Sequence, residues 1–144
     1  LMMAMVAATV ANKGEQMTPY LVSRILDPDL NEVSSTSTKV ARTPIDSATA
    51  SSLSSLMQTA VAEGTGTSAQ VSGVQVAGKT GTAETGSDNG PTTWFVGFAG
   101  TDIDKPEIAL AVVLDGNAET EDGATGGKIA GPVAAQVIDA AVNQ

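Results

Sequence analysis

Four consecutive residues, Lys79-Thr80-Gly81-Thr82, carry the groups best suited to bind and react with another molecule. They follow the apolar run Val74–Gly78 and are therefore expected to lie on a strand. Because side chains alternate along a strand, the hydroxyls of Thr80 and Thr82 should share one face. Lys79 adds a positive charge, and Gly81 leaves the backbone open to close approach. This combination suits a carboxylate-binding strand edge, although a solvated edge lysine beside two β-forming threonines would look the same in isolation.

Residue types that are missing from the sequence exclude several mechanisms. The chain has no histidine and no cysteine, which excludes Ser-His-Asp and Cys-His catalysis, a histidine-ligated metal and thiolate zinc sites. Any general base must be Lys, Asp, Glu or Tyr. The acidic run Glu119–Asp122 lacks regular cation-ligand spacing and is expected to be a solvated loop. We therefore predict neither a metal nor a cofactor.

The charge balance limits the classes of partner. Sixteen acidic residues against seven basic ones give a net charge of −9, which argues against nucleic acid and against an anionic membrane surface as direct partners. The longest apolar stretch, Leu1–Ala11, is too short to cross a bilayer. It has the character of a helix interior, so we expect Leu1 to be a truncation or cleavage point.

Hydrophobic periodicity predicts the elements that position Lys79 and its neighbours. Helices are expected at 1–13, at 46–63 and from Pro132 onward. The first should be buried, since it is apolar nearly all round. Asp46 or Ser47 can cap the second and Gly64 can end it. Between the first two helices we expect a strand over 20–26, a turn over 27–31 and an exposed strand or hairpin arm over 32–42.

Short turns join the strand that carries Lys79 to strands at 93–100 and 108–114, which predicts a three-strand antiparallel meander. The strand at 108–114 is apolar on both faces, so helices should cover both sides of the sheet. Trp94 and Phe95 are expected in the core. One core suffices for a chain of 144 residues. We predict an α+β fold over residues 1–144, an antiparallel sheet flanked by helices.

Several segments, in their order along the chain, resemble landmarks of a single known family. These segments are Met5–Gly14 with Met17–Val22, the turn Gly64–Gly66, the strand segment Lys79–Ala83, the strand Trp94–Phe98, and Gly126-Gly127 with Ala130–Val133. Together they are similar to the C-terminal half of the transpeptidase domain of a class B penicillin-binding protein, a peptidoglycan D,D-transpeptidase. The resemblance implies the fold shared by serine β-lactamases and penicillin-binding proteins.

The resemblance also implies a chemistry, which is acyl transfer from a D-Ala-D-Ala stem peptide to a serine that β-lactam antibiotics also acylate. Lys79 would attract the carboxylate beside the scissile amide and help proton shuttling. The hydroxyls of Thr80 and Thr82 would donate to that carboxylate, and Gly81 would let the substrate lie close. The backbone N–H of Thr82 would be the second donor of the oxyanion hole. We therefore predict catalytic roles for Lys79 and Thr82, and substrate and β-lactam binding by Thr80, Gly81 and Thr82.

Two other signatures of this family, a Ser-x-x-Lys helix and a Ser-x-Asn loop, should precede Lys79, and neither is there. Ser87-Asp88-Asn89 spells the second but follows Lys79 in a predicted turn, so we interpret it as turn chemistry. No serine stands three residues before any Lys or Arg. Residues 1–144 alone are therefore not expected to be acylated. The resemblance places the serine on a preceding half of the domain, without which apolar surface should be exposed on the first helix and the strands.

A serine β-lactamase and a non-catalytic β-lactam or muropeptide sensor module are the alternative hypotheses. Under the preferred one, the partners are the peptidoglycan stem peptide, β-lactams, the preceding half of the domain and other proteins of cell-wall synthesis. The resemblance further implies an extracytoplasmic protein, anchored in the cell membrane by a segment outside these residues, that acts in cell shape or cell division.

Overall fold

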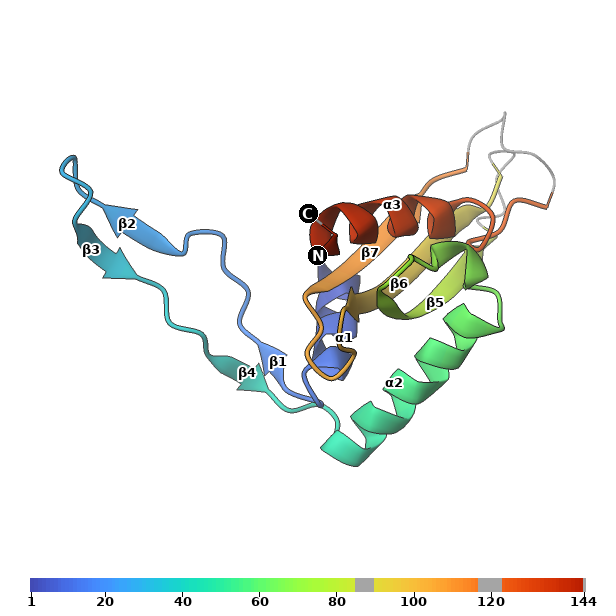
Figure 1. The fold of residues 1–144 in the computed structure, drawn as a ribbon, viewed down its shortest axis with the longest axis horizontal. Coiled ribbons are helices and arrows are strands. Elements are labelled where there is room, and N and C mark those ends of the chain that lie inside the picture. Colours follow the sequence, from blue (N-terminus) through green and yellow to red (C-terminus); the bar gives the residue numbers. More distant parts are fainter. Residues whose placement is uncertain (85–89, 117–122, 144) are drawn as a thin grey trace.

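A three-strand antiparallel sheet forms the centre of the fold (Figure 1). The computed structural model describes residues 1–84, 90–116 and 123–143. The strands are β5 (Gln75–Ala83), β6 (Thr92–Gly100) and β7 (Ile108–Leu114), in the order β5-β6-β7. The pairing of β5 with β6 is continuous from Gln75 opposite Gly100 to Ala83 opposite Thr92. The predicted meander is confirmed.

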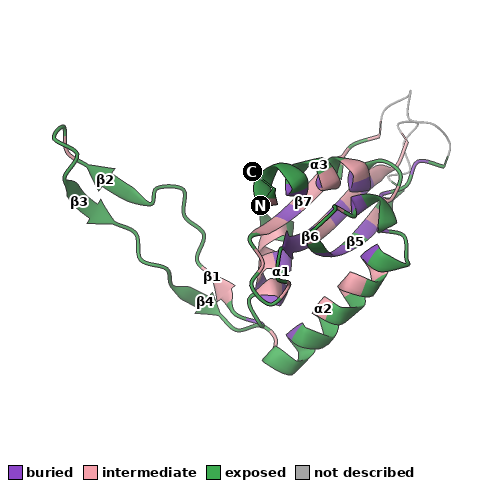
Figure 2. Cartoon of the chain, in the orientation of Figure 1, coloured by how far each residue is buried: buried purple, intermediate pink, exposed green. Residues whose placement is uncertain are grey.

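Three helices pack around this sheet. α1 (Met2–Ala11) covers one face, α3 (Ala130–Val142) covers the other, and α2 (Ser47–Ala62) runs along β5. Side chains alternate along β6, so Phe95 packs towards α3 with Ala134 and Ile138, whereas Phe98 packs towards α1 with Ala7 and Val10. Both phenylalanine side chains are fully buried. Buried residues accordingly gather along the strands and the inner sides of the helices (Figure 2).

The start of α2 follows from its capping residue. Asp46 is the N-cap, and its carboxylate accepts a 2.7 Å hydrogen bond from the backbone N–H of Thr49. This backbone hydrogen bond lowers the pKa of Asp46. The helix ends before Gly64, as its sequence predicts.

Replacing Asp46 with alanine should destabilise α2 and lower the thermal midpoint at neutral pH, since an N-cap bond is lost. The folded-state pKa of Asp46 lies below its ordinary value of 3.8. At pH values above 3.8 the carboxylate is charged, and its hydrogen bond to the helix contributes its full stabilisation. This stabilisation is lost as the pH falls through the lower folded-state pKa, because the carboxylate becomes protonated. Thermal melts of the unaltered protein and the Asp46→Ala variant should differ at pH 7 and converge in acid. A constant difference at all pH values would contradict this origin.

Four features differ from the predictions. Tyr20–Val22 is not a strand, because Pro19 has no N–H to donate and pairing stops at the bond from Thr18 N–H to the Lys39 carbonyl. A short 3-10 helix, Thr67–Ala69, interrupts the expected loop at 65–72. α3 begins two residues before Pro132, which the first helical turn tolerates. α1 is buried on one side only, at Ala7, Thr9 and Val10.

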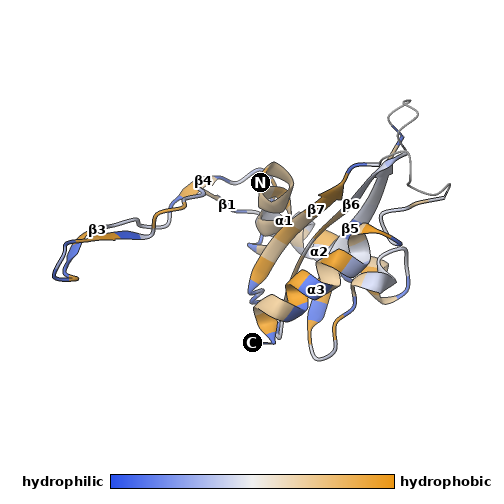
Figure 3. Ribbon diagram, turned by 90° about the horizontal axis from the view of Figure 1, so that it is seen from above, coloured by the Kyte–Doolittle hydropathy of each residue, from blue (hydrophilic) through white to orange (hydrophobic). Residues whose placement is uncertain are grey.

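A narrow arm connects α1 to α2 and projects away from the sheet (Figure 1). Its base pairs β1 (Gln16–Met17) with β4 (Val40–Arg42), and its outer part pairs β2 (Arg24–Leu26) with β3 (Glu32–Ser35). Asp27 closes the tip by accepting hydrogen bonds from Asp29 and Asn31. Apolar and polar residues mix along the arm (Figure 3), and nearly all of it is exposed. The expected turn and exposed hairpin arm are both confirmed.

Candidate functional site

Lys79, Thr80, Gly81 and Thr82 lie in the second half of β5, the outer strand of the sheet. Thr80 is opposite Phe95 and Thr82 is opposite Thr93, so both threonines lie on the face that packs towards α3. Lys79 and Gly81 lie on the other face, towards α1. Lys79 and Thr82 are exposed, whereas only 9% of Thr80 is exposed. The positive charge and the two hydroxyls therefore approach the strand edge from opposite faces.

Two loops contact the threonine hydroxyls. The hydroxyl oxygens of Thr65 and Thr80 lie 2.6 Å apart, in a hydrogen bond. The backbone N–H of Gly126 donates to the hydroxyl of Thr82 at 3.1 Å. The loops are themselves joined, because the Ser68 hydroxyl donates to the carbonyl of Gly127. The loop that follows α2 and the loop that precedes α3 thus form one support behind the strand.

Gly126 is a glycine because the backbone of β5 and β6 leaves it no room. A Cβ atom there would lie 2.4 Å from the carbonyl oxygens of both Gly81 and Trp94. Such distances are far below van der Waals contact, and both obstacles are backbone atoms that cannot rotate away. Only glycine can bring its N–H close enough to Thr82.

The ammonium group of Lys79 donates a 2.5 Å hydrogen bond to the carbonyl of Thr80. This carbonyl is available because β5 has β6 on one side and no other strand on its second side within the described residues. Backbone groups of alternate residues point to the same side of a strand. The N–H of Thr82 therefore points to the free edge together with the carbonyl of Thr80.

Gly81 differs from Gly126, since the fold itself leaves space beside it. An added Cβ atom would meet only the side chain of Trp94, at an ordinary contact distance of 3.4 Å. Trp94 is partly exposed and lies directly opposite Gly81. Its predicted place in the core is therefore wrong, whereas that of Phe95 is confirmed. The reason is strand alternation, which turns Trp94 to the face of Lys79 and Phe95 to the face of α3.

An open apolar groove of about 470 Å³ runs beside Lys79, Thr80 and Gly81. Its other lining residues come from α1, α2 and β6: Met3, Val6, Ala7, Val10, Leu53, Met57, Trp94 and Val96. Met3, Val6 and Leu53 are all exposed. The expectation of exposed apolar surface is therefore confirmed for the first helix, whereas Trp94 and Val96, the apolar strand residues of this groove, are only partly exposed.

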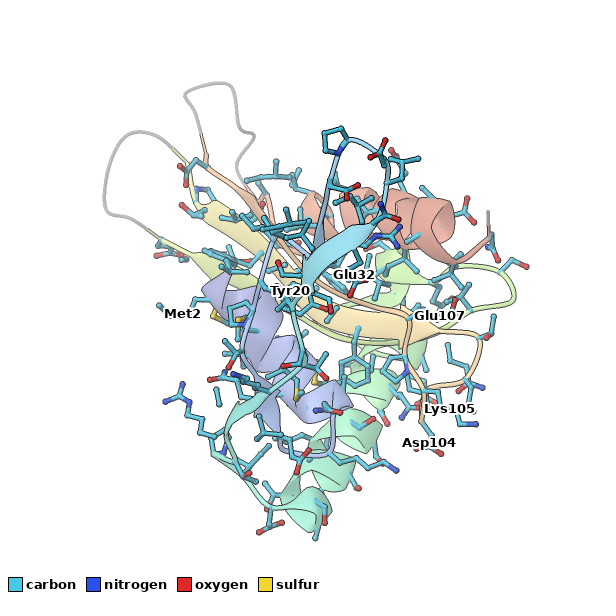
Figure 4. The ribbon with its side chains drawn as sticks, turned by 90° about the vertical axis from the view of Figure 1, so that its left-hand side faces the viewer. Met2, Tyr20, Glu32, Asp104, Lys105 and Glu107 are labelled. Atoms are coloured by element: carbon cyan, nitrogen blue, oxygen red, sulfur yellow. The ribbon has the colours of Figure 1, made fainter. Side chains whose placement is uncertain are left out.

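A second, smaller hollow of about 330 Å³ lies between the C-terminal half of α1 and the turn from β6 to β7. Asp104, Lys105 and Glu107 project from this turn (Figure 4), and Lys13 lines the hollow from the end of α1. It contains none of the residues from 79 to 82. We therefore treat it as separate from the site on β5.

Sequence reasoning did not assign Thr65, Gly126 or Trp94 to the site. Trp94 is identified by the observed register of β5 and β6, which places it opposite Gly81. No local pattern pairs Thr65 with Thr80 across fifteen residues.

Ser87-Asp88-Asn89 and Glu119–Asp122 lie outside the described residues. Within the described ranges, no three acidic, His or Cys residues are grouped to hold a metal, and no helix could span a membrane.

A comparison with protein families gives one match along most of the sequence. The family described as penicillin binding protein transpeptidase domain matches residues 1–139. The chain belongs to this family. The transpeptidase-family resemblance that Lys79–Ala83 and its flanking segments suggest is thereby confirmed.

The curated relatives of this transpeptidase-family chain are longer proteins. Peptidoglycan D,D-transpeptidase PbpA of Mycolicibacterium smegmatis is 38% identical, in an alignment that covers 98% of this chain and 28% of the relative. PbpA of Mycobacterium tuberculosis is 40% identical over 96% of this chain and 28% of the relative. Stage V sporulation protein D of Bacillus subtilis is 32% identical over 94% and 21%. The chain thus spans less than a third of the length of these relatives.

Solved structures agree with the described fold. The ceftriaxone acyl-enzyme complex of penicillin-binding protein A from M. tuberculosis has a TM-score of 0.83 at 38% identity, over 96% of this chain and 31% of that protein. The penicillin G acyl-enzyme complex of the same protein has a TM-score of 0.78 at 34% identity, over 98% and 31%. The predicted α+β fold class is therefore confirmed.

Proposed function

We propose that residues 1–144 are the C-terminal portion of the transpeptidase domain of a peptidoglycan D,D-transpeptidase and form one side of its active site. The observation that carries the proposal is the free edge of β5. There a lysine, two supported hydroxyls and an outward N–H lie within four residues. Family membership and the acyl-enzyme complexes of similar proteins support the same reaction class.

Each group on this edge has a role in acyl transfer. Lys79 attracts the carboxylate beside the scissile amide and assists proton transfer, and the hydroxyls of Thr80 and Thr82 donate to that carboxylate. The N–H of Thr82 donates to the oxyanion, and removal of one such donor typically raises the barrier by about 3–4 kcal/mol. The space beside Gly81 lets the stem peptide or β-lactam lie against the strand. A side chain there would fit the fold but would occupy the ligand's place.

The nucleophilic serine comes from the preceding part of the domain. No serine stands three residues before a lysine in residues 1–144, and the matched relatives are more than three times as long. The groove between α1, α2 and β5 is apolar and adjoins Lys79, which suits it to receive a helix that carries Ser-x-x-Lys. Residues 1–144 by themselves are then inactive.

This function implies where the protein is located and which proteins it works with. The substrate is the D-Ala-D-Ala stem peptide of peptidoglycan, which lies outside the cytoplasm, so the protein is extracytoplasmic. A segment before residue 1 anchors it in the membrane. Other cell-wall synthesis proteins would be its partners in cell shape or division.

Labelling with a fluorescent penicillin tests the proposal. The full-length protein should form a covalent adduct that survives denaturing electrophoresis, and excess unlabelled penicillin G should block it. Slow release of the adduct is expected for a transpeptidase, whereas rapid steady hydrolysis of a chromogenic cephalosporin would indicate a serine β-lactamase. Reversible binding by folded protein without any adduct would indicate a sensor module and would contradict the proposal.

A further inference from the structure

We infer that Thr65 is a positioning residue, whose hydroxyl turns the proton of Thr80 towards the carboxylate of the substrate. The inference rests on the proposed function and extends it to a residue in the loop after α2. Thr65 lies fifteen residues before Thr80, and their hydroxyl oxygens are 2.6 Å apart.

Counting protons gives the direction of this hydrogen bond in the complex. Each hydroxyl has one proton, and one of the two lies between the oxygen atoms. If Thr80 donated to Thr65, Thr80 would have no proton left for the substrate, and its lone pairs would face a carboxylate. If Thr65 donates, the proton of Thr80 is free to point to the strand edge. A bound carboxylate therefore selects the arrangement in which Thr65 donates.

Thr82 has the same arrangement, and the direction of its hydrogen bond is fixed by the type of its partner. The backbone N–H of Gly126 can only donate, so Thr82 accepts this hydrogen bond and keeps its own proton free. Thr80 and Thr82 share one face, and each contacts a donor from a loop behind the strand. A hydroxyl that accepts a hydrogen bond becomes a stronger donor, so both loops strengthen the hydrogen bonds from Thr80 and Thr82 to a carboxylate.

The position of Thr65 is fixed by contacts that do not involve its hydroxyl. The N–H of Gly66 donates to the carbonyl of Ala60 at the end of α2. On the other side, Gly127 lies so close that a Cβ atom on it would be 2.3 Å from the carbonyl of Thr65. Thr65 itself is exposed. Removing its hydroxyl therefore opens no core cavity, and the effect can be separated from folding.

Thr65→Val in the full-length protein tests this role, because it removes the hydroxyl and keeps the shape. We expect the second-order rate constant for acylation by penicillin G to fall about five- to tenfold, as for the loss of one hydrogen bond. The methyl ester of penicillin G has no carboxylate, and its rate should change less than about twofold. Thr65→Ser should restore the rate with the free acid.

Thr67→Val is the matched control, since Thr67 is an exposed threonine two residues further along, at the start of the 3-10 helix. It should leave both rates unchanged. An equal loss with acid and ester would show that Thr65 acts only on the local structure, and an unchanged rate with the acid would show that its hydroxyl is not used. Either result overturns the inference while the unaltered protein is still acylated. Failure of the unaltered protein to react would instead overturn the proposed function and this inference with it.

Discussion

Replacing Lys79 with alanine in the full-length protein should slow acylation by penicillin G about 30- to 150-fold. Lys79 is the basic residue of the β5 edge, and its ammonium lies against the backbone of Thr80. The loss of a hydrogen bond to a charged group costs about 2–3 kcal/mol, and each 1.36 kcal/mol corresponds to about tenfold in rate. The rate is measured from the time course of fluorescent penicillin labelling at several concentrations.

Two variants make the Lys79 result specific. Lys79→Arg keeps the charge and should retain more activity than Lys79→Ala. Lys105→Ala removes another exposed lysine, from the turn between β6 and β7, and should label like the unaltered protein. Unchanged labelling of Lys79→Ala would remove Lys79 from the mechanism.

Phe95→Ala should lower the free energy of unfolding by about 3–5 kcal/mol, the usual effect of deleting a buried aromatic side chain. Phe95 is fully buried between β5, β7 and α3. Its ring lies against Gly78 so closely that a Cβ atom there would be 2.2 Å away. Glycine at 78 leaves room for the ring, and alanine at 95 leaves a cavity that neighbouring side chains cannot fill. Thermal denaturation of the full-length protein, followed by circular dichroism, measures the effect.

Val137→Ala is a suitable comparison for Phe95→Ala. Val137 belongs to the same side of the sheet, on α3, but 42% of it is exposed. It should shift the thermal midpoint far less than Phe95→Ala. Similar shifts for the two variants would contradict the packing described around Phe95.

The meander could be predicted from sequence because each of its determinants is local. Short turns impose antiparallel pairing, and the two-sided apolar pattern of Ile108–Leu114 requires helices on both faces. The alternation at Thr80 and Thr82 likewise follows from strand geometry alone. Asp46 as the cap of α2 is a residue-type preference that the structure retains.

The rest of the site depends on contacts between distant segments. Thr65 meets Thr80 only because α2 ends beside β5, and Gly126 meets Thr82 only because the lead-in to α3 crosses the same strand. Trp94 is large and apolar, which favours burial, yet its register places it beside the groove. Composition cannot distinguish these outcomes, because they depend on how segments that are distant in the sequence pack against β5 and β6.

The arm between α1 and α2 has a consequence for how this family can vary in length. Its two ends leave the rest of the fold at one point, where Gly14 lies so close to Ile45 that a Cβ atom would be 2.2 Å from the Ile45 carbonyl. Above this point Gln16 pairs with Arg42, and the arm touches little else. Lengthening such an excursion costs only about 0.6 kcal/mol for each doubling of loop length. Insertions and deletions at its tip can therefore accumulate during evolution while the edge of β5 keeps its geometry.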